Sequence, residues 1–148
     1  MARTPRNRAD VQVFAEIGAI GQLTRNRLER ALPDGLSYAQ FGLLVRLAHH
    51  GAEENPAQLA QAFQVTKGAM TNTLQRLQAQ GFVAIVGDAA DGRRKRVSIT
   101  RSGLAAHDRG LAATRPVMDS LRARFSDAEF AAALPFLSEL RAWLDETR

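Results

Sequence analysis

The 148-residue sequence has no cysteine and no long hydrophobic run, and each absence excludes a class of protein. Without cysteine there is no disulfide framework, no cysteine-ligated zinc and no thiol chemistry. No run of about 18 apolar residues occurs, so we expect no membrane-spanning helix. The basic start is followed by Asp10, Gln12 and Glu16 rather than by an apolar core, so we expect no signal peptide and a cytoplasmic location.

Catalytic signatures are also missing. The sequence shows no spacing of nucleophile, base and orienting residue, and no glycine-rich phosphate loop. We therefore expect neither an enzyme nor a cofactor. The length suits one domain with a real core, and the apolar fraction of 45% is ordinary for a helical protein.

Three histidines are the candidates for metal binding. His49 and His50 precede Glu53 and Glu54, and His107 lies further along the chain. Imidazole and carboxylate together can hold zinc. Adjacent histidines on a helix point about 100° apart, so only one of the pair could share a site with His107. Histidine is also favoured at a helix C-terminus by the helix dipole, which explains His49 and His50 without a metal. We therefore expect no metal site, and metal binding by these histidines is the alternative.

The most informative stretch is a basic turn between two short apolar runs. Residues 82–86 and 97–100 have the composition of the two arms of a β-hairpin. Turn-forming residues surround Gly92, and four cations follow at once: Arg93, Arg94, Lys95 and Arg96. A protruding loop of this charge suits a polyanion, although a solvated surface turn has the same composition.

A helix is expected over residues 67–80, directly before this hairpin. Thr66 can cap its start and Gly81 can end it in a left-handed conformation. Met70, Leu74 and Leu77 recur at helical spacing and form one apolar face.

The opposite face of this helix carries short polar side chains and little bulk. Asn and Gln side chains can pair with adenine edges in the major groove, and cations at the margin can meet phosphates. An ordinary solvated helix face is the alternative. The candidate DNA-binding residues of this helix are Thr66, Lys67, Gly68, Thr71, Asn72, Gln75 and Arg76.

A shorter helix is expected just before it. Asn55-Pro56 provides an N-cap and a first-turn proline, residues 58–63 continue the helix, and Gln64-Val65 turns the chain into Thr66. Two helices joined by a short turn and followed by a basic hairpin indicate a winged helix-turn-helix, in which the hairpin is the wing. The predicted fold class is mainly α with a small β-hairpin wing.

The positive charge is concentrated in this region. Residues 64–101 contain seven cations and two anions, a net charge of +5, which equals the net charge of the whole chain. The rest of the chain is therefore balanced, and the excess lies where a phosphate backbone would be met.

Two motifs resemble the MarR family, the multiple-antibiotic-resistance type regulators. The family's wing signature is resembled by Asp88-x-x-Asp91-x-Arg93-x-x-x-Val97-x-Ile99-Thr100-x-x-Gly103. The family's recognition helix and its exit are resembled by Thr71-x-x-Leu74-x-x-Leu77-x-x-x-Gly81-Phe82-Val83. The motifs cover residues 58–103, while the order of elements fits across nearly the whole chain. Ala89 stands where proline is common in the family, and Ile99 where leucine is usual.

The resemblance implies roles for the wing residues. Arg93 would enter the minor groove, and Asp91 would hold its guanidinium by a charge-assisted hydrogen bond. From the residues alone, Asp91 could equally be a turn former. The candidate DNA-binding residues of the wing are Asp91, Arg93, Arg94, Lys95 and Arg96.

Apolar helices flank the DNA-binding module on both sides. We expect an N-terminal dimerisation helix within residues 1–36, the winged helix-turn-helix module over residues 37–101, and C-terminal dimerisation helices over residues 102–148, all in one domain. These helices carry more apolar surface than the module needs, so we expect a homodimer on a palindromic operator, with intramolecular packing in a monomer as the alternative.

The predicted function is a homodimeric, sequence-specific DNA-binding transcriptional regulator. The resemblance further implies a repressor that responds to a small lipophilic or aromatic effector bound between the dimer helices and the DNA-binding module. Two alternatives share the same fold: a non-specific architectural DNA-binding protein, and a winged-helix module that binds another protein.

Overall fold

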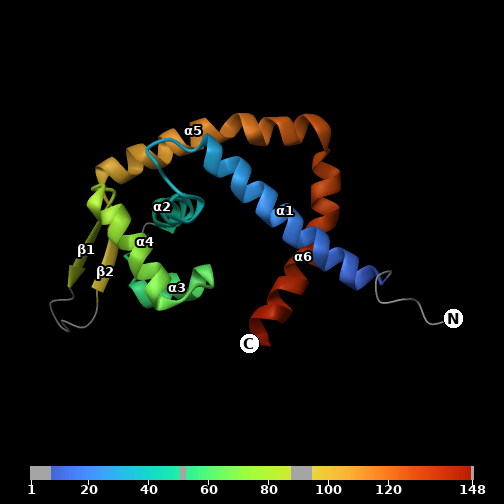
Figure 1. Cartoon of the computed structure of the whole chain (residues 1–148), viewed down its shortest axis with the longest axis horizontal. Helices are drawn as coiled ribbons and strands as arrows, with labels where there is room; N and C mark the ends of the chain where they lie inside the picture. The colour runs from blue at the N-terminus through green and yellow to red at the C-terminus, as the bar shows by residue number, and fades with distance from the viewer. Residues whose placement is uncertain (1–7, 51–52, 88–94, 148) are drawn as a thin grey trace. The chain divides into compact units, whose positions relative to one another are not determined.

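Helices and one two-stranded antiparallel hairpin make up the described part of the chain. The computed structural model describes residues 8–50, 53–87 and 95–147. It confirms the mainly α fold class with its small β-hairpin. Along the chain the elements are α1 (Ala9–Ala31), α2 (Tyr38–His50), α3 (Pro56–Phe63), α4 (Lys67–Ala79), β1 (Val83–Gly87), β2 (Lys95–Ile99), α5 (Arg101–Arg124) and α6 (Asp127–Glu146) (Figure 1).

The chain divides into two units, Met1–Thr114 and Arg115–Arg148, which are described separately. The first contains α1 to α4, the hairpin and the first part of α5. The second contains the end of α5 and all of α6, with the rings of Phe125 and Phe130 in edge contact at 6.2 Å. The predicted boundaries at residues 36 and 101 remain predictions.

Side-chain caps fix where several helices begin. The Thr66 hydroxyl accepts a hydrogen bond from the Ala69 amide at 3.1 Å, which starts α4 at the predicted residue. Ser37 and Gln40 form a reciprocal capping box at the start of α2. Two further capping boxes open α3 and α6, formed by Asn55 with Gln58 and by Ser126 with Glu129.

Left-handed residues end the two helices of the helix-turn-helix. Gln64 has φ of 58° after α3, and the following Val65 amide donates back to the Ala60 carbonyl, which turns the chain toward α4. Gly81 has φ of 75° after α4, which confirms it as the predicted end of that helix.

The core of the first unit lies between α2, α3, α4, the hairpin and the first turns of α5. Helix α4 contributes the predicted apolar face, and it packs against α2, α3 and β1 (Figure 1). Burying such side chains stabilises the fold by about 1.5–3 kcal/mol each. The fully buried large side chains are Leu43, Leu44, Leu59, Leu74, Leu77 and Val97.

The hairpin is longer on its second arm than the apolar pattern predicts. Strand β2 begins at Lys95 rather than at Val97, because Lys95 and Arg96 pair with Gly87 and Val86 of β1. Backbone pairing does not require apolar side chains, so the ladder continues into the exposed part of the hairpin. Two of the four predicted loop cations therefore belong to a strand.

One hydroxyl joins the exit of α4 to the start of α5. Thr100 Oγ1 donates to the Gly81 carbonyl at 2.6 Å and accepts from the Gly103 amide at 3.0 Å. The Phe82 carbonyl lies against the same turn of α5 and accepts from the Thr100 amide. The wing exit and the first turn of α5 are thus held together by short polar contacts.

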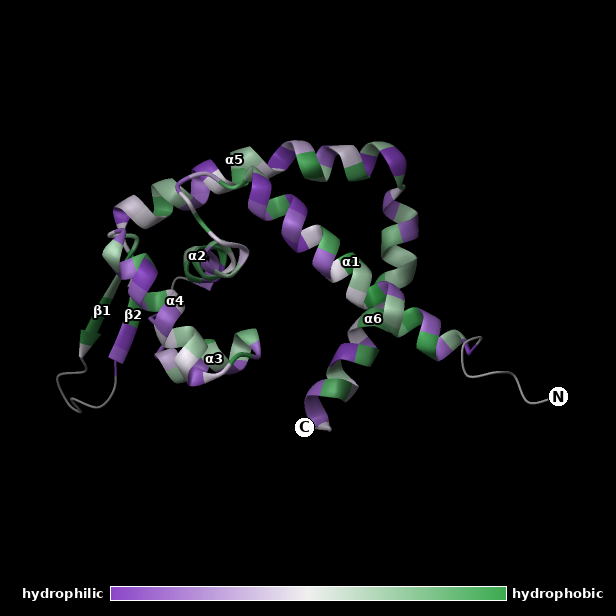
Figure 2. Cartoon of the chain, in the orientation of Figure 1, coloured by the Kyte–Doolittle hydropathy of each residue, from purple (hydrophilic) through white to green (hydrophobic). Residues whose placement is uncertain are grey.

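The terminal helices keep their apolar residues outside this core. Neither α1 nor α6 has a buried residue, and hydrophobic residues recur among hydrophilic ones along both (Figure 2). In α5 the buried positions are mostly small residues, whereas Leu104 and Leu111 are about two-fifths exposed. Within residues 8–50, 53–87 and 95–147, no helix is long and apolar enough to cross a bilayer.

We expect Gly103→Ala to destabilise the chain by about 3 kcal/mol. A Cβ at residue 103 would stand 2.0 Å from the Phe82 carbonyl oxygen and 2.8 Å from Ile99 Cγ1, so backbone must shift to admit it. Urea unfolding at neutral pH measures the change.

Gly68→Ala is the matched control, since nothing lies within 4 Å of a Cβ built at that residue. Its expected effect is within about 1 kcal/mol, because alanine is the better helix former. Equal stabilities for the two variants would contradict the packing of Gly103.

Candidate nucleic-acid interface

The exposed surface of α4 consists of two parallel rows of predicted site residues. Gly68, Asn72 and Arg76 are spaced four apart and form one row, and Lys67, Thr71 and Gln75 form the other. All six are exposed, as is the capping Thr66, while Met70, Leu74 and Leu77 hold the opposite side in the core. The structure therefore leaves the whole predicted face of this helix open.

A groove of about 610 Å³ separates α4 from the hairpin and the start of α3. It brings the second row of α4 together with a wing residue that lies 20 to 28 positions further along the sequence. Leu74 and Ile85 contribute apolar surface to the lining. The predicted site residues on its walls are Lys67, Thr71, Gln75 and Lys95.

Sequence reasoning missed Gln78, which also lines this groove. It lies three residues after Gln75 and seven after Thr71, so it extends the same row by one turn. The helical spacing contains that signal. The position lies near the end of the helix, where the sequence alone does not show how far the wing reaches.

The Thr71 hydroxyl is already committed as a donor. It donates to the Lys67 carbonyl at 2.9 Å, which leaves its oxygen lone pairs as the free hydrogen-bonding capacity. Thr71 is therefore suited to accept a hydrogen bond, for example from an amino group, without leaving its place on the helix.

The predicted wing residues are only partly described. Asp91, Arg93 and Arg94 lie outside the described residues. Lys95 and Arg96 are exposed on β2, and Arg96 forms an ion pair with Glu53 at 3.3 Å between Nη1 and Oε2. Glu53 precedes residues 64–101, so the net charge of +5 for that range leaves it out, and the folded chain is less positive around Arg96 than this number suggests.

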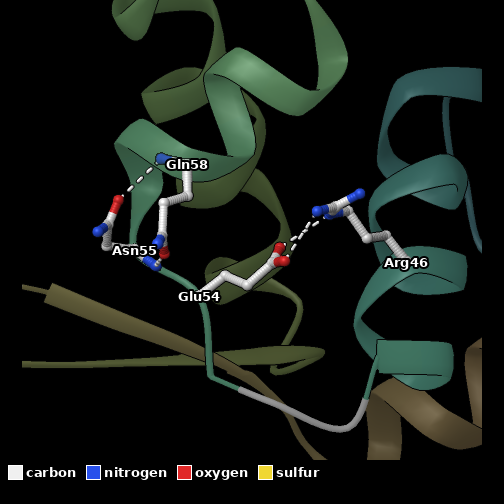
Figure 3. A network of polar contacts seen from close by, with 4 residues as sticks. All are labelled: Arg46, Glu54, Asn55 and Gln58. Atoms are coloured by element: carbon white, nitrogen blue, oxygen red, sulfur yellow. Dashed lines mark hydrogen bonds and ion pairs between the residues drawn. The ribbon is translucent and has the colours of Figure 1, made fainter.

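Arg46 and Glu54 form an ion pair with two hydrogen bonds beside strand β2. Arg46 of α2 donates from Nε and Nη2 to the two carboxylate oxygens of Glu54, each at 2.8 Å (Figure 3). The pair is only partly exposed, with 30% of the Arg46 side chain and 16% of the Glu54 side chain accessible. These hydrogen bonds from Arg46 lower the pKa of Glu54 below its ordinary value of 4.5.

The histidines show one close pair. The rings of His49 and His107 meet edge to face with centroids 5.7 Å apart, and His107 is buried against Phe41. Across the described ranges, no three histidine or carboxylate side chains are grouped to hold a metal ion. The geometry thus supplies aromatic packing between α2 and α5, and metal binding by these residues stays untested.

Comparison with known proteins places this fold and sequence among transcriptional regulators. Residues 34–94 match the sequence profile of the MarR family. The transcriptional regulator HosA of Escherichia coli O157:H7 is 32% identical over 122 residues, which cover 82% of this chain and 83% of HosA.

Two solved structures illustrate the shared fold. A probable transcriptional regulator from Pseudomonas aeruginosa has a TM-score of 0.77 at 26% identity, covering 90% of this chain and 99% of that one. Bordetella bronchiseptica BpsR, whose DNA binding is regulated by 6-hydroxynicotinic acid, has a TM-score of 0.77 at 20% identity, covering 95% of this chain and 98% of BpsR. Both support the winged-helix assignment of the described elements.

We expect Glu54→Gln to lower the free energy of unfolding by about 1–2 kcal/mol at pH 7, because it removes the charge that Arg46 binds. A lowered pKa in the folded state contributes stability above the ordinary value of 4.5, and this contribution is lost as the pH falls through the lowered pKa. The difference between the wild type and the variant should therefore shrink as urea unfolding is repeated at decreasing pH below 4.5.

Asp119→Asn is the control for this measurement. Asp119 pairs with Arg122 on the same helix, and both side chains are largely exposed. Its removal should change stability by no more than about 0.5 kcal/mol. A Glu54→Gln difference that persists unchanged in acid would show that the ion pair is not its cause.

Proposed function

The chain belongs to the MarR family of transcriptional regulators, and we propose that it acts as a homodimeric, sequence-specific repressor that releases its operator when a small effector binds. It is a regulator and not an enzyme, and DNA binding is implied by the family. As a DNA-binding regulator it would act in the cytoplasm.

The observation that carries sequence specificity is the bare polar face of α4. Its side chains are short, exposed and rich in amide and hydroxyl groups, while its apolar side is fixed in the core. A helix of this kind can approach base edges in the major groove, where Asn and Gln read adenine. We assign base reading to Asn72 and Gln75, and phosphate contact to Lys67 and Arg76 at the margins.

The wing supplies the second contact in this proposal. Lys95 lines the groove beside α4, so it can face the backbone of a duplex that α4 has entered. Arg96 follows it on β2 and points to the opposite face of the strand, where it pairs with Glu53. For Asp91, Arg93 and Arg94, the proposal rests on the family resemblance. Arg93 would enter the minor groove with Asp91 holding its guanidinium.

The terminal helices support a dimer. Large apolar residues that are 37–67% exposed recur along α1, and others that are 42–60% exposed recur along α6. Monomeric proteins rarely expose so many large apolar side chains along a helix, and a second copy would cover them. A two-fold dimer presents two recognition helices, so the operator should be a palindrome with half-sites about 10 base pairs apart.

The proposed effector is a small lipophilic or aromatic molecule. Regulation of BpsR by 6-hydroxynicotinic acid, a small aromatic acid, supports an effector of similar class here. A ligand that favours a spacing of the two recognition helices unlike the groove repeat would weaken operator binding by the difference in its affinity for the two states.

Selection of bound sequences from random DNA at fixed salt should return a palindrome, and Asn72→Ala should then lose about 1–3 kcal/mol of discrimination at one base position in each half-site. Binding to the selected duplex and to its single-base variants measures this. Asn26→Ala, which changes an exposed asparagine on α1, should leave the profile unchanged.

An equal loss on every duplex would reduce Asn72 to a phosphate contact. Recovery of no common motif would favour the architectural DNA-binding protein, and absence of binding in dilute buffer would favour the protein-interaction module.

Light scattering at micromolar concentration should give twice the mass of one chain. Ile20→Glu places a charge on an α1 residue that is 58% exposed in the single chain, and it should shift the protein toward monomer because the charge would be buried at the interface. Val65→Glu, at an apolar residue that is 44% exposed outside the terminal helices, should remain dimeric. A wild-type monomer would contradict the dimer.

A further inference from the structure

Three consecutive residues before α3 each bind a different element of the first unit. Glu53 pairs with Arg96 of β2. Figure 3 shows the other two contacts, in which Glu54 pairs with Arg46 of α2 and Asn55 caps α3 through its box with Gln58. We call residues 53–55 the bridging segment. It contacts the wing, α2 and the first helix of the helix-turn-helix at once.

The bridging segment covers the outer edge of the wing. The Val97 amide of β2 donates to the Glu54 carbonyl at 2.8 Å, and Glu54 and Val97 form an antiparallel bridge. Strand β2 is thereby held by β1 on one side and by Glu54 on the other. A two-stranded hairpin is marginally stable alone, so this outer contact adds to what fixes its position.

The Glu54 side chain ties the same residue to α2. The two parallel hydrogen bonds from Arg46 define both a distance and an orientation, which a single-point contact does not. The Glu53–Arg96 pair is weaker, since both side chains are more than half exposed. The fixed end of the bridging segment is therefore the contact between Arg46 and Glu54.

Helix α2 also packs against α4. Helix α2 thus contacts the recognition helix through packing, and it contacts the wing directly at β2 and through Arg46 and Glu54. The groove between α4 and the hairpin has Lys67 on one wall and Lys95 on the other, and the packing of β1 on α4 joins the two walls. The Glu54 contact lies at the outer edge of β2, at Val97, two residues from Lys95, so a shift of β2 at that edge would move Lys95.

We propose that Glu54 is a positioning residue for DNA binding: held by Arg46, it fixes the place of the wing relative to the recognition helix. The inference rests on the proposed DNA-binding function and deepens it. Glu54 touches no DNA in this scheme, and its effect passes through β2 to the wing cations. Contacts that must match two surfaces of a duplex together are sensitive to displacements on the order of 1 Å.

The test compares Glu54→Gln with Lys95→Ala in the full-length protein. The probe is a duplex carrying the palindrome selected from random DNA, titrated at several salt concentrations. Glu54→Gln should weaken binding about tenfold and lower the salt slope by about 1, and Lys95→Ala should act in the same direction. The base profile read by α4 should not change.

Non-additivity separates positioning from a general loss of stability. The double variant Glu54→Gln/Lys95→Ala should bind about as weakly as Glu54→Gln alone, because a displaced wing has already lost the Lys95 contact. Arg46→Lys keeps the charge but cannot form the two-pronged contact, and it should reproduce Glu54→Gln. Asp119→Asn should bind like the wild type.

Amide hydrogen exchange without DNA gives an independent measurement. In Glu54→Gln the Val97 amide and its neighbours in β1 and β2 should exchange faster by a factor about ten times larger than the factor for the α4 amides, whose exchange rises only with the loss of global stability. Unchanged exchange in the hairpin overturns the inference, even for a variant that binds DNA poorly.

Three other results also overturn the inference while leaving the DNA-binding proposal intact. These are a double variant whose loss of affinity is the product of the two single losses, a salt slope that Glu54→Gln does not change, and binding by Arg46→Lys that equals that of the wild type. If the wild type binds no duplex, the proposed function fails and the inference fails with it as a statement about DNA. The exchange experiment then reports separately whether Glu54 holds the hairpin.

Discussion

The structure depends on one constraint: α4 must bury one face completely and leave the other bare. Met70, Leu74 and Leu77 meet the first condition against α2 and α3, and this contact fixes the rotation of the helix about its axis. The other face of α4 meets the second condition, because its side chains are mostly short and lie exposed. If the helix turned by one residue, polar groups would enter the core and the candidate interface would be lost with the fold.

The two parts of the candidate interface are held by different kinds of interaction. Apolar packing holds α4, whereas the exposed half of the hairpin is held by a backbone bridge to Glu54 and by ion pairs. Packing responds little to salt or moderate acid, while the ion pair of Glu54 with Arg46 responds to both. Salt and pH should therefore affect the position of the wing more than the position of the recognition helix.

Local rules predicted the elements, and long-range contacts decided the site. The cap at Thr66, the end at Gly81 and the buried face of α4 follow from residues close together in sequence, and all are confirmed. The groove shared by Thr71 and Lys95, the contact of Arg46 with Glu54 and the approach of Glu53 to Arg96 join residues from separate elements. No periodicity or spacing encodes them, so the sequence alone could not reveal them.

Thr100 makes the first turn of α5 and the last turn of α4 a single joint. Its hydroxyl donates to the Gly81 carbonyl and accepts from the Gly103 amide, so both contacts are made to main-chain atoms. A twist applied to α5 at this end therefore reaches the exit of the recognition helix through the Thr100 hydroxyl and through the hydrogen bond from the Thr100 amide to the Phe82 carbonyl. Serine would preserve both connections, whereas valine, of nearly the same shape, would keep only the second.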